Sequence, residues 1–313
     1  MELGIAIVSY NTRDLTAGCL ASVYQEMETS GLCGQVWVVD NASKDGSAEM
    51  VKARFPQTHL VANEENVGFA RATNMAIAQM KASGNLPEYV LLLNPDTRVR
   101  PGALVRMASF LESHPRVAVV GPRLTYGDGT FQHSAFHFPT LLMAFLDFWP
   151  LHHQLLDSRL NGRYPKRLYE AGKPFSIDHP LGAAMMVRKE TIQEVGLLDD
   201  EYFMYCEEID WCKRIKEAGW EIYCLPSAEI VHFAAQSTRQ FAEEMFVALW
   251  RSRYRLFQKH YGRAYRVAAR LIVRAGLWYK MWLLKRERRQ GELSRGEMER
   301  KRAAYRHIAE LEM

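Results

Sequence analysis

Apolar runs and amphipathic stretches alternate along the first 120 residues of the chain. The apolar runs predict buried strands at Ile5–Val8, Val36–Val39, His59–Ala62, Tyr89–Asn94 and Val117–Val120. Apolar residues at helical spacing predict helices over residues 15–27, 48–54, 69–81 and 103–113. Such alternation is typical of an α/β fold, in which a mostly parallel sheet carries helices on both faces.

The regular pattern stops between Gly121 and His179, a segment rich in aromatic residues, His and Pro. Long irregular segments of this kind usually serve as binding loops or lids. The pattern returns with Ala183–Arg188, a helix over Glu207–Ala218, strands near Ile222–Leu225 and Ile230–Phe233, and a strongly helical stretch over Phe241–Leu284. We therefore expect an α/β domain over residues 1–238, in halves of about 1–120 and 121–238, and a helical extension over residues 239–313.

Composition excludes several classes of protein. Hydrophobic residues make up 48% of the chain and charged residues 24%, which is typical of a folded globular protein. The five cysteines form no C-x-x-C pair, so we expect neither a disulfide framework nor a zinc site, and a reducing cytoplasm fits best. No uncharged apolar run reaches 18 residues, and no signal peptide is expected before the first strand.

The net charge of +4 is distributed unevenly along the chain. Residues 239–313 hold 19 Lys and Arg against 8 Asp and Glu, whereas residues 1–238 hold 21 against 28. A basic extension on an acidic body indicates that the extension meets an anionic surface. It does not indicate that the body binds nucleic acid.

Short polar segments follow the predicted strands and are the first candidates for ligand binding, because the sequence contains no glycine-rich dinucleotide motif and no P-loop. Ser9, Tyr10 and Asn11 follow the first strand, and Asp40 and Asn41 follow the second. An Asp at such a position can accept hydrogen bonds from a nucleotide base or ribose. The alternative is a structural turn, in which Asn, Asp and Ser are common.

The segment that opens the third predicted helix is a candidate anion site. Gly68 lets another backbone approach closely, and Asn66 can cap the helix. A helix N-terminus favours an anion, so Arg71 and Asn74 are candidates for contact with a diphosphate. An ordinary helix cap is the alternative.

The fourth strand ends abruptly at Asn94-Pro95-Asp96. The Asp96 carboxylate can bind Mg²⁺ or Mn²⁺, which prefer carboxylate and phosphate oxygens. Asn94 can hydrogen-bond a sugar or phosphate without adding a second negative charge. A type I turn built on Asn-Pro-Asp is the alternative.

Three carboxylates, those of Glu207, Glu208 and Asp210, crowd the start of one predicted helix. Mutual repulsion raises the pKa of such groups toward a value useful for a general base. Complementing the helix dipole is the alternative, and Asp210 is also placed to pair with Arg214. His232 lies on a later apolar strand, either as a core residue or as a ligand of metal or phosphate.

Taken together, these segments resemble the family 2 glycosyltransferases, specifically the rhamnosyltransferase-like branch. The matching segments run in family order over roughly residues 3–260: Ile7–Asn11, Val38–Ser47, Glu65–Ala70, Leu92–Asp96, Pro180–Ala183, Gly196–Tyr205 and Glu207–Trp211. The ordered set is far more specific than any one segment. The resemblance implies a GT-A fold, transfer of a sugar from a nucleotide sugar, and a divalent cation, Mg²⁺ or Mn²⁺.

The resemblance also implies roles for individual residues. Asp40 would bind the nucleotide base, with Ser9, Tyr10 and Asn11 lining its pocket. Further contacts to the nucleotide sugar would come from Asn41, Asn66, Gly68, Arg71, Asn74 and Asn94. Asp96 would be the metal-binding end of the family's D-x-D element, with His232 helping to hold metal or diphosphate.

The catalytic base implied by the resemblance is Glu208, with Glu207 in reserve and Asp210 beside them. Gly182, Ala183 and Trp211 would lie near the donor sugar and the acceptor. The chain departs from the family pattern twice, because Asn94 replaces the first Asp of D-x-D and Glu208 stands where Asp is usual. Asp96 is therefore the main protein carboxylate expected on the metal.

The implied reaction is a single displacement with inversion, in which the base deprotonates an acceptor hydroxyl. The donor would be dTDP-rhamnose or a UDP-hexose, and the acceptor a lipid-linked or cell-surface glycan. Two rival interpretations remain: a sugar-1-phosphate nucleotidyltransferase, and a non-catalytic nucleotide-sugar or glycan-binding module on the same fold.

The extension mixes aromatic, aliphatic and basic residues, including Leu271, Trp278, Trp282, Arg274 and Lys285. This pattern favours a helix lying in the interface of an anionic membrane, which predicts a peripheral protein at the inner face of the plasma membrane. The alternative is a helix that packs on the catalytic domain or on a second subunit, as in a homodimer.

Overall fold

The computed structural model describes residues 2–234, 242–290 and 293–312. The chain forms two compact units. The first comprises Met1–Phe136, Tyr164–Phe203 and Glu207–Ser237, and the second comprises His137–Arg163, Met204–Cys206 and Thr238–Met313. The second unit thus includes residues 137–163, which the sequence assigned to the α/β domain, while the expected boundary at residue 238 lies outside the described residues.

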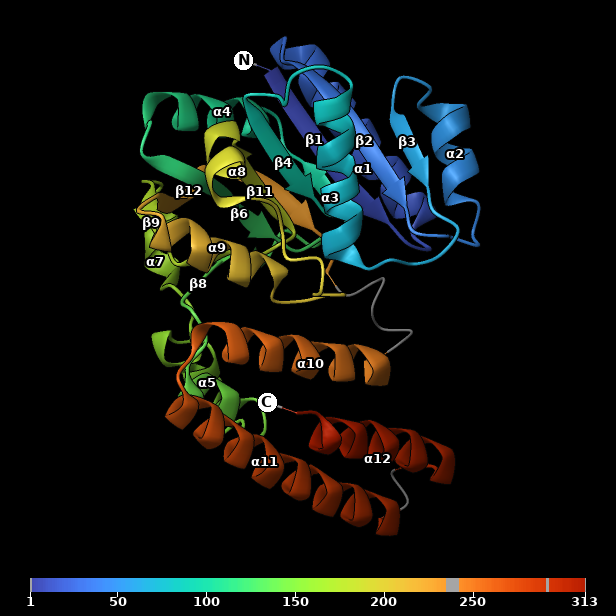
Figure 1. Cartoon of the computed structure of the whole chain (residues 1–313), viewed down its shortest axis with the longest axis vertical. Coiled ribbons are helices and arrows are strands. Elements are labelled where there is room, and N and C mark those ends of the chain that lie inside the picture. Colours follow the sequence, from blue (N-terminus) through green and yellow to red (C-terminus); the bar gives the residue numbers. More distant parts are fainter. Residues whose placement is uncertain (1, 235–241, 291–292, 313) are drawn as a thin grey trace. The chain divides into compact units, whose positions relative to one another are not determined.

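A mixed sheet forms the centre of the first unit. Its main strands are β1 (Glu2–Ser9), β2 (Cys33–Asp40), β3 (His59–Ala62), β4 (Tyr89–Leu93), β5 (Thr97–Val99), β6 (Val117–Thr125), β11 (Ala184–Arg188) and β12 (Glu221–His232). Their order is β3-β2-β1-β4-β11-β6-β12-β5, and β3 to β4 lie side by side in Figure 1. The strands β3, β2, β1 and β4 are parallel, whereas β11 runs antiparallel to both β4 and β6.

Short strands and helices complete the first unit. The short strands are β7 (Phe131–Gln132), β8 (Ala135–Phe136), β9 (Phe175–Ser176) and β10 (His179–Pro180). The helices are α1 (Arg13–Ser30), α2 (Ser47–Arg54), α3 (Phe69–Ala82), α4 (Ala103–Ser113), α7 (Lys166–Glu170), α8 (Lys189–Val195) and α9 (Glu207–Glu217).

Helices cover both faces of the sheet because successive strand residues point to opposite sides. Leu3, Ile5 and Ile7 of β1 join the core that α1 and α4 close. Gly4 faces the other side, where a Cβ would come within 2.7 Å of Met80 Sδ on α3. The prediction of a mostly parallel sheet with helices on both faces is confirmed.

Two predicted strands are in fact one. Strand β12 continues through Pro226 and Ser227 instead of stopping, and its pairing with β6 shifts register between Leu225 and Glu229. A bulge accommodates a proline within a strand without ending it. The sequence pattern showed two apolar runs because the bulge interrupts their alternation.

The second unit is helical. It contains α5 (Leu141–Leu146), α6 (His153–Leu156), a 3₁₀ turn (Arg159–Asn161), α10 (Ala242–His260), α11 (Arg263–Arg289) and α12 (Arg295–Glu310). The helical stretch predicted from residue 241 is therefore divided at Tyr261 and Gly262, and Phe241 itself lies outside the described residues. None of the helices described is long and apolar enough to cross a membrane.

Aromatic side chains form the core of this unit. Phe148 stacks on Trp250 with ring centroids 5.0 Å apart, and both are fully buried together with Phe257. Gly276 of α11 lies directly against the Phe148 ring, in space that a Cβ would fill. The glycine therefore allows α11 to approach the aromatic core closely.

Candidate functional site

The polar segments that follow β1 and β2, here called strand tips, lie next to each other at one edge of the sheet. Ser9 is the register partner of Asp40, and Asn41 N donates to Ser9 O over 2.8 Å. Strand β4 leads to the third strand tip, at Asn94 and Asp96. It pairs with the other side of β1, so that Leu93 opposes Ile7. The parallel register therefore brings all three tips to the same edge, as expected for a ligand site.

Hydrogen bonds connect the loops that follow β1 and β2. Asn11 N donates to Ser43 Oγ over 2.9 Å, and Lys44 N donates to Asn11 Oδ1 over 2.8 Å. Asn11 and Ala42 have φ of 52° and 62°, and non-glycine residues in this left-handed region concentrate at functional sites. The two loops form one rigid polar surface.

Asp40 is 3% exposed and only one of its oxygens is used. Its Oδ2 accepts from Ser43 N over 2.9 Å, whereas Oδ1 is buried without a hydrogen-bond partner among the described residues. A buried carboxylate oxygen that lacks a donor is costly unless a ligand supplies one. The geometry therefore suits acceptance of a hydrogen bond from a bound base.

Ser9 and Tyr10 differ in their access to a ligand. The Ser9 hydroxyl is fully buried and lies 3.1 Å from Thr12 Oγ1 and 3.2 Å from Thr16 Oγ1. Its side chain thus supports the loop from within rather than lining the surface. Tyr10 is 36% exposed and can reach a ligand.

The start of α3 is organised around Gly68 rather than by a cap from Asn66. The helix begins at Phe69 with no side-chain cap, and Asn66 Oδ1 instead accepts from Gly68 N over 3.0 Å. Gly68 O accepts from Asn41 Nδ2 over 3.2 Å. Phe69 N donates to Phe203 O over 2.7 Å, which connects this segment to the loop that precedes α9.

The two side chains proposed to contact a diphosphate from α3 have different settings. Arg71 is exposed and available. Asn74 Nδ2 donates to Leu198 O over 2.8 Å, so Asn74 holds the loop between α8 and α9 in place. The structure thus gives Asn74 a positioning role.

The strand tip at Asn94 and Asp96 joins two other parts of the site. Asn94 N donates to Ala183 O over 2.9 Å, which places Gly182 and Ala183 beside it. Asp96 is 3% exposed, and its Oδ1 lies 3.4 Å from His232 Nε2. The expected pairing of Asp96 with His232 in space is therefore present, although 136 residues separate them.

The other ring nitrogen of His232 has a partner that the sequence did not suggest. His232 Nδ1 lies 3.2 Å from Gln132 Oε1. When Nδ1 donates to this amide oxygen, Nε2 keeps a lone pair beside the Asp96 carboxylate, and these two groups would be the ones to hold a cation. No third His, Cys, Asp or Glu completes a metal cluster within the described ranges, so further ligands would have to come from diphosphate or water.

The two glutamates that open α9 have distinct environments. Glu207 is 6% exposed, and burial, followed by repulsion from Glu208, raises its pKa well above the usual value. Glu208 is half-buried beside Gly182, where a Cβ would lie 3.5 Å from Glu208 Cγ. Gly182 precedes Ala183, whose carbonyl oxygen accepts from Asn94 N, so the Glu208 side chain lies close to the edge of the sheet where the polar segments meet.

Asp210 and Trp211 are placed in the core rather than toward a substrate. Asp210 is fully buried and accepts from Arg214 Nε over 2.9 Å. Arg214 also donates to Val195 O and Leu197 O, at 2.9 and 2.8 Å. Trp211 is fully buried with Nε1 bonded to Gly196 O, so both residues fix the loop after α8, and the sugar contact expected of Trp211 is not met.

Three features of the site do not follow from the side-chain pattern of the sequence. Gln132 gave no signal, because it lies in the irregular region. Phe203 acts through its backbone, which no side-chain pattern reveals. Tyr205 and Cys206 have φ of 71° and 66° immediately before Glu207, and such strain concentrates at functional sites.

Comparison with known proteins identifies the class. The family described as Glycosyl transferase family 2 matches residues 4–196, and the chain belongs to this family. It is a glycosyltransferase, and the match covers the three strand tips but ends before α9. The fold is that of the GT-A glycosyltransferases. A solved neighbour with this fold is the mannosyltransferase from Pyrobaculum calidifontis, in complex with GDP-Man and Mn²⁺. It superposes with a TM-score of 0.57 at 15% identity, over 98% of this chain and 85% of that one.

Curated relatives support the rhamnosyltransferase-like branch. The N-acetylglucosaminyl-diphospho-decaprenol L-rhamnosyltransferase of Mycobacterium tuberculosis (strain H37Rv) is 28% identical over 262 residues, which cover 80% of this chain and 83% of the relative. The rhamnosyltransferase WbbL of Escherichia coli (strain K12) is 28% identical over 183 residues, or 57% of this chain and 66% of the relative. The resemblance drawn from the ordered motifs is therefore confirmed.

Proposed function

We propose that this chain transfers a sugar from a nucleotide sugar to a hydroxyl of a lipid-linked or cell-surface glycan, with inversion at the anomeric carbon. Rhamnose from dTDP-rhamnose is the first candidate, because the relatives named above are rhamnosyltransferases. A hexose from a UDP-sugar is the second. The observation that carries the proposal is the convergence of Asp40, Asp96 with His232, and Glu208 with Gly182 on one edge of the sheet.

Donor binding is assigned to the loops after β1, β2 and β3. The unused Asp40 Oδ1 accepts a hydrogen bond from the base, and the exposed side chain of Tyr10 covers the base. Asn11, held by Ser43, and Asn41, held by Gly68, keep these loops in a shape that is ready for the nucleotide. Preorganisation of this kind reduces the entropy lost on binding.

The diphosphate is assigned to the neighbourhood of Asp96 and His232. Asp96 and His232 would hold Mg²⁺ or Mn²⁺, because a buried carboxylate oxygen and an imidazole nitrogen lie 3.4 Å apart there. Such an ion would neutralise the charge that develops on the leaving diphosphate. Asn94 can donate a hydrogen bond to the donor from its amide side chain.

Glu208 is assigned as the general base. Burial, followed by repulsion from Glu208, raises the pKa of Glu207, so the half-buried Glu208 is the better candidate of the two for the base. The carboxylate removes the proton of the acceptor hydroxyl, the hydroxyl oxygen attacks C1, and the C1–O bond to the diphosphate breaks. No enzyme nucleophile is needed, because one displacement completes the transfer.

The helical extension is assigned to peripheral contact with an anionic membrane. The Mycobacterium tuberculosis relative is named for a decaprenol-linked acceptor, and an acceptor of that kind resides in a bilayer. Helix α11 carries nine Arg and Lys and one Glu, which favours approach to anionic lipid. The proposed location is the cytoplasmic face of the plasma membrane.

Incubation with a panel of nucleotide sugars tests this function. The expected result is release of nucleoside diphosphate from one donor, dependent on Mg²⁺ or Mn²⁺ and abolished in Asp96→Ala. A nucleotidyltransferase would instead form pyrophosphate from a nucleoside triphosphate and a sugar 1-phosphate. Metal-dependent thermal protection by a nucleoside diphosphate, with no turnover of any donor even when prenyl-linked acceptors are supplied, would favour a binding module and contradict the proposal.

A further inference from the structure

Helix α11 has an apolar stripe that is largely exposed in the part of the chain that the structure describes. Val267, Leu271, Trp278 and Trp282 recur at intervals of four and seven residues and therefore lie on one side of the helix. They are 54%, 63%, 67% and 48% exposed. The buried residues of α11, such as Val273 and Leu277, face the opposite side, so the helix has a second apolar face beyond the one that packs in the core.

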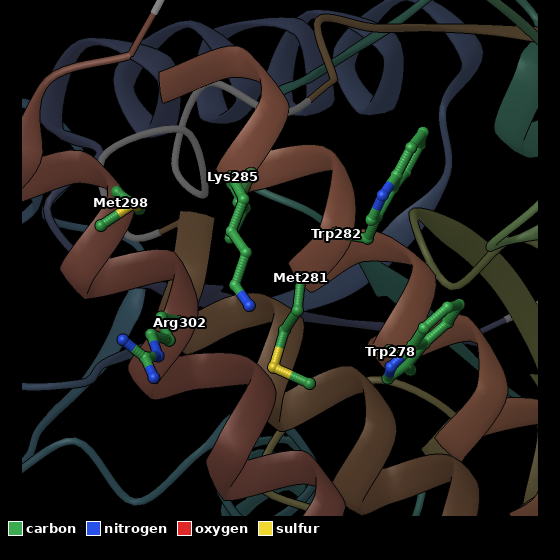
Figure 2. A pocket seen from close by; sticks show the side chains of 7 residues that line it. Trp278, Met281, Trp282, Lys285, Met298 and Arg302 are labelled. Carbon is green, nitrogen blue, oxygen red and sulfur yellow. The ribbon is translucent and has the colours of Figure 1, made fainter. Parts of the chain in front are cut away.

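This stripe leads into a cleft between α11 and α12. Figure 2 shows Trp278 and Trp282 projecting from the same side of α11, with Met298 and Arg302 on the neighbouring helix. The cleft has a volume of about 280 Å³ and is lined by Trp278, Met281, Trp282, Leu284, Lys285, Met298 and Arg302. Its lining is therefore largely apolar, with two cations.

The cleft contains two cations, Lys285 on α11 and Arg302 on α12. Among the described residues, neither Lys285 nor Arg302 forms an ion pair, although Arg295 on the same helix as Arg302 pairs with Glu299. A pair of unneutralised cations beside an apolar cleft is complementary to a molecule with an anionic head and an apolar chain.

We propose that this cleft binds an anionic phospholipid of the bilayer surface, with the phosphate at Lys285 and Arg302 and an acyl chain along Trp278, Met281 and Met298. The inference rests on the proposed function, because it explains how the enzyme meets a membrane-borne acceptor. A second copy of the chain is a poorer occupant, since it would bring the same excess of positive charge to the contact. Trp278 and Trp282 suit the interface of a bilayer with water, because an indole ring is apolar except for its polar N–H group.

Sedimentation with vesicles of phosphatidylcholine, with and without phosphatidylglycerol, tests the charge component. The full-length protein is expected to bind only the anionic vesicles. Each basic residue near a membrane surface changes the partition coefficient about fivefold, so Lys285→Gln with Arg302→Gln should reduce binding about 25-fold. The matched control is Arg286→Gln with Arg300→Gln, which removes the same charge from the same helices outside the cleft.

Quenching of tryptophan fluorescence by brominated acyl chains tests the apolar component. The expected result is strong quenching that falls by more than half when Trp278 and Trp282 are both changed to Phe, because these two are 67% and 48% exposed whereas Trp37, Trp211 and Trp250 are buried. Equal loss of binding in the cleft and control pairs would overturn the proposal. So would unquenched fluorescence on anionic vesicles, or a concentration-dependent dimer that disappears in the Trp278→Phe and Trp282→Phe variant.

Release of diphosphate from the nucleotide sugar separates failure of this inference from failure of the proposed function. The cleft variants are expected to release it at the wild-type rate in solution, since Lys285 and Arg302 have no part in the catalytic site. A protein that turns over donor but ignores anionic vesicles contradicts the lipid cleft alone. A protein that binds the vesicles through the cleft but turns over no donor supports the cleft and contradicts the proposed function.

Discussion

Gly68→Ala perturbs the point where the donor loops meet the loop that precedes α9. Gly68 has φ of 86° and ψ of 170°, a conformation that residues with a Cβ rarely adopt. An added Cβ would lie 2.5 Å from Phe203 O and 2.9 Å from Phe203 Cα. Because both of these are backbone atoms, the loop has to move, and the hydrogen bond from Phe69 N to Phe203 O is strained with it.

A matched control separates the loss of unfolding free energy into two parts. Gly196 has nearly the same backbone conformation, with φ of 84° and ψ of −173°, but a Cβ there would meet nothing within 4 Å. Both substitutions should lower the free energy of unfolding by about 1–3 kcal/mol through backbone strain. Gly68→Ala should lower it by about 1–3 kcal/mol more through the clash with Phe203.

Urea denaturation of the two variants measures this difference in unfolding free energy. Calorimetry measures how tightly each variant binds a nucleoside diphosphate, which reports on the donor site. Gly196→Ala is expected to bind nucleotide as the wild type does, whereas Gly68→Ala should bind at least tenfold more weakly because Asn41 loses its anchor at Gly68 O. Equal unfolding free energies together with equal nucleotide affinities in the two variants would refute the coupling of these loops.

Three further predictions concern stability. The raised pKa of Glu207 means that the folded state binds this proton more tightly than the unfolded chain, so stability falls as pH rises above about 4.5. Glu207→Gln should therefore be more stable than the wild type at pH 8 and equal to it near pH 4, as judged by urea denaturation. Asp210→Asn should lower the free energy of unfolding by about 3 kcal/mol, because it leaves the Arg214 guanidinium without its buried partner, and an unchanged urea midpoint would contradict that role. Gly276→Ala should lower the melting temperature of the helical unit despite the better helix propensity of Ala, since overpacking against Phe148 costs about 1–3 kcal/mol against a gain of about 1 kcal/mol; a raised melting temperature would show that Phe148 can move aside.

Local sequence pattern was sufficient for most of the fold. The strands through Val38, Leu91 and Val119 are continuous apolar runs because both faces of the sheet are covered, and the pattern predicts them within a few residues. It failed at β12, where Pro226 and Ser227 interrupt the run inside a bulge. The grouping of residues 137–163 with the C-terminal helices was also hidden, since it depends on contacts such as that between Phe148 and Gly276.

The candidate site was predictable where function depends on a side chain at a strand end. Asp40 and Asp96 were proposed from their positions at strand ends and Glu208 from its position at the start of a helix, whereas burial could not be inferred for Ser9, Asp210 or Trp211. A polar residue next to a ligand-binding segment has the same pattern whether it contacts the ligand or holds the loop from behind. Only the three-dimensional contacts, such as the one from Asp210 to Arg214, distinguish the two roles.

The rate of sugar transfer by Glu208→Gln is the decisive test of proton removal by Glu208. The measurement compares this variant with the wild type at saturating donor and acceptor, with nucleoside diphosphate affinity measured on the same samples. A fall in kcat of at least about 100-fold with unchanged nucleotide affinity is expected, because the amide cannot accept the proton of the acceptor hydroxyl. A kcat within a few-fold of the wild type would contradict the assignment of Glu208 as the base.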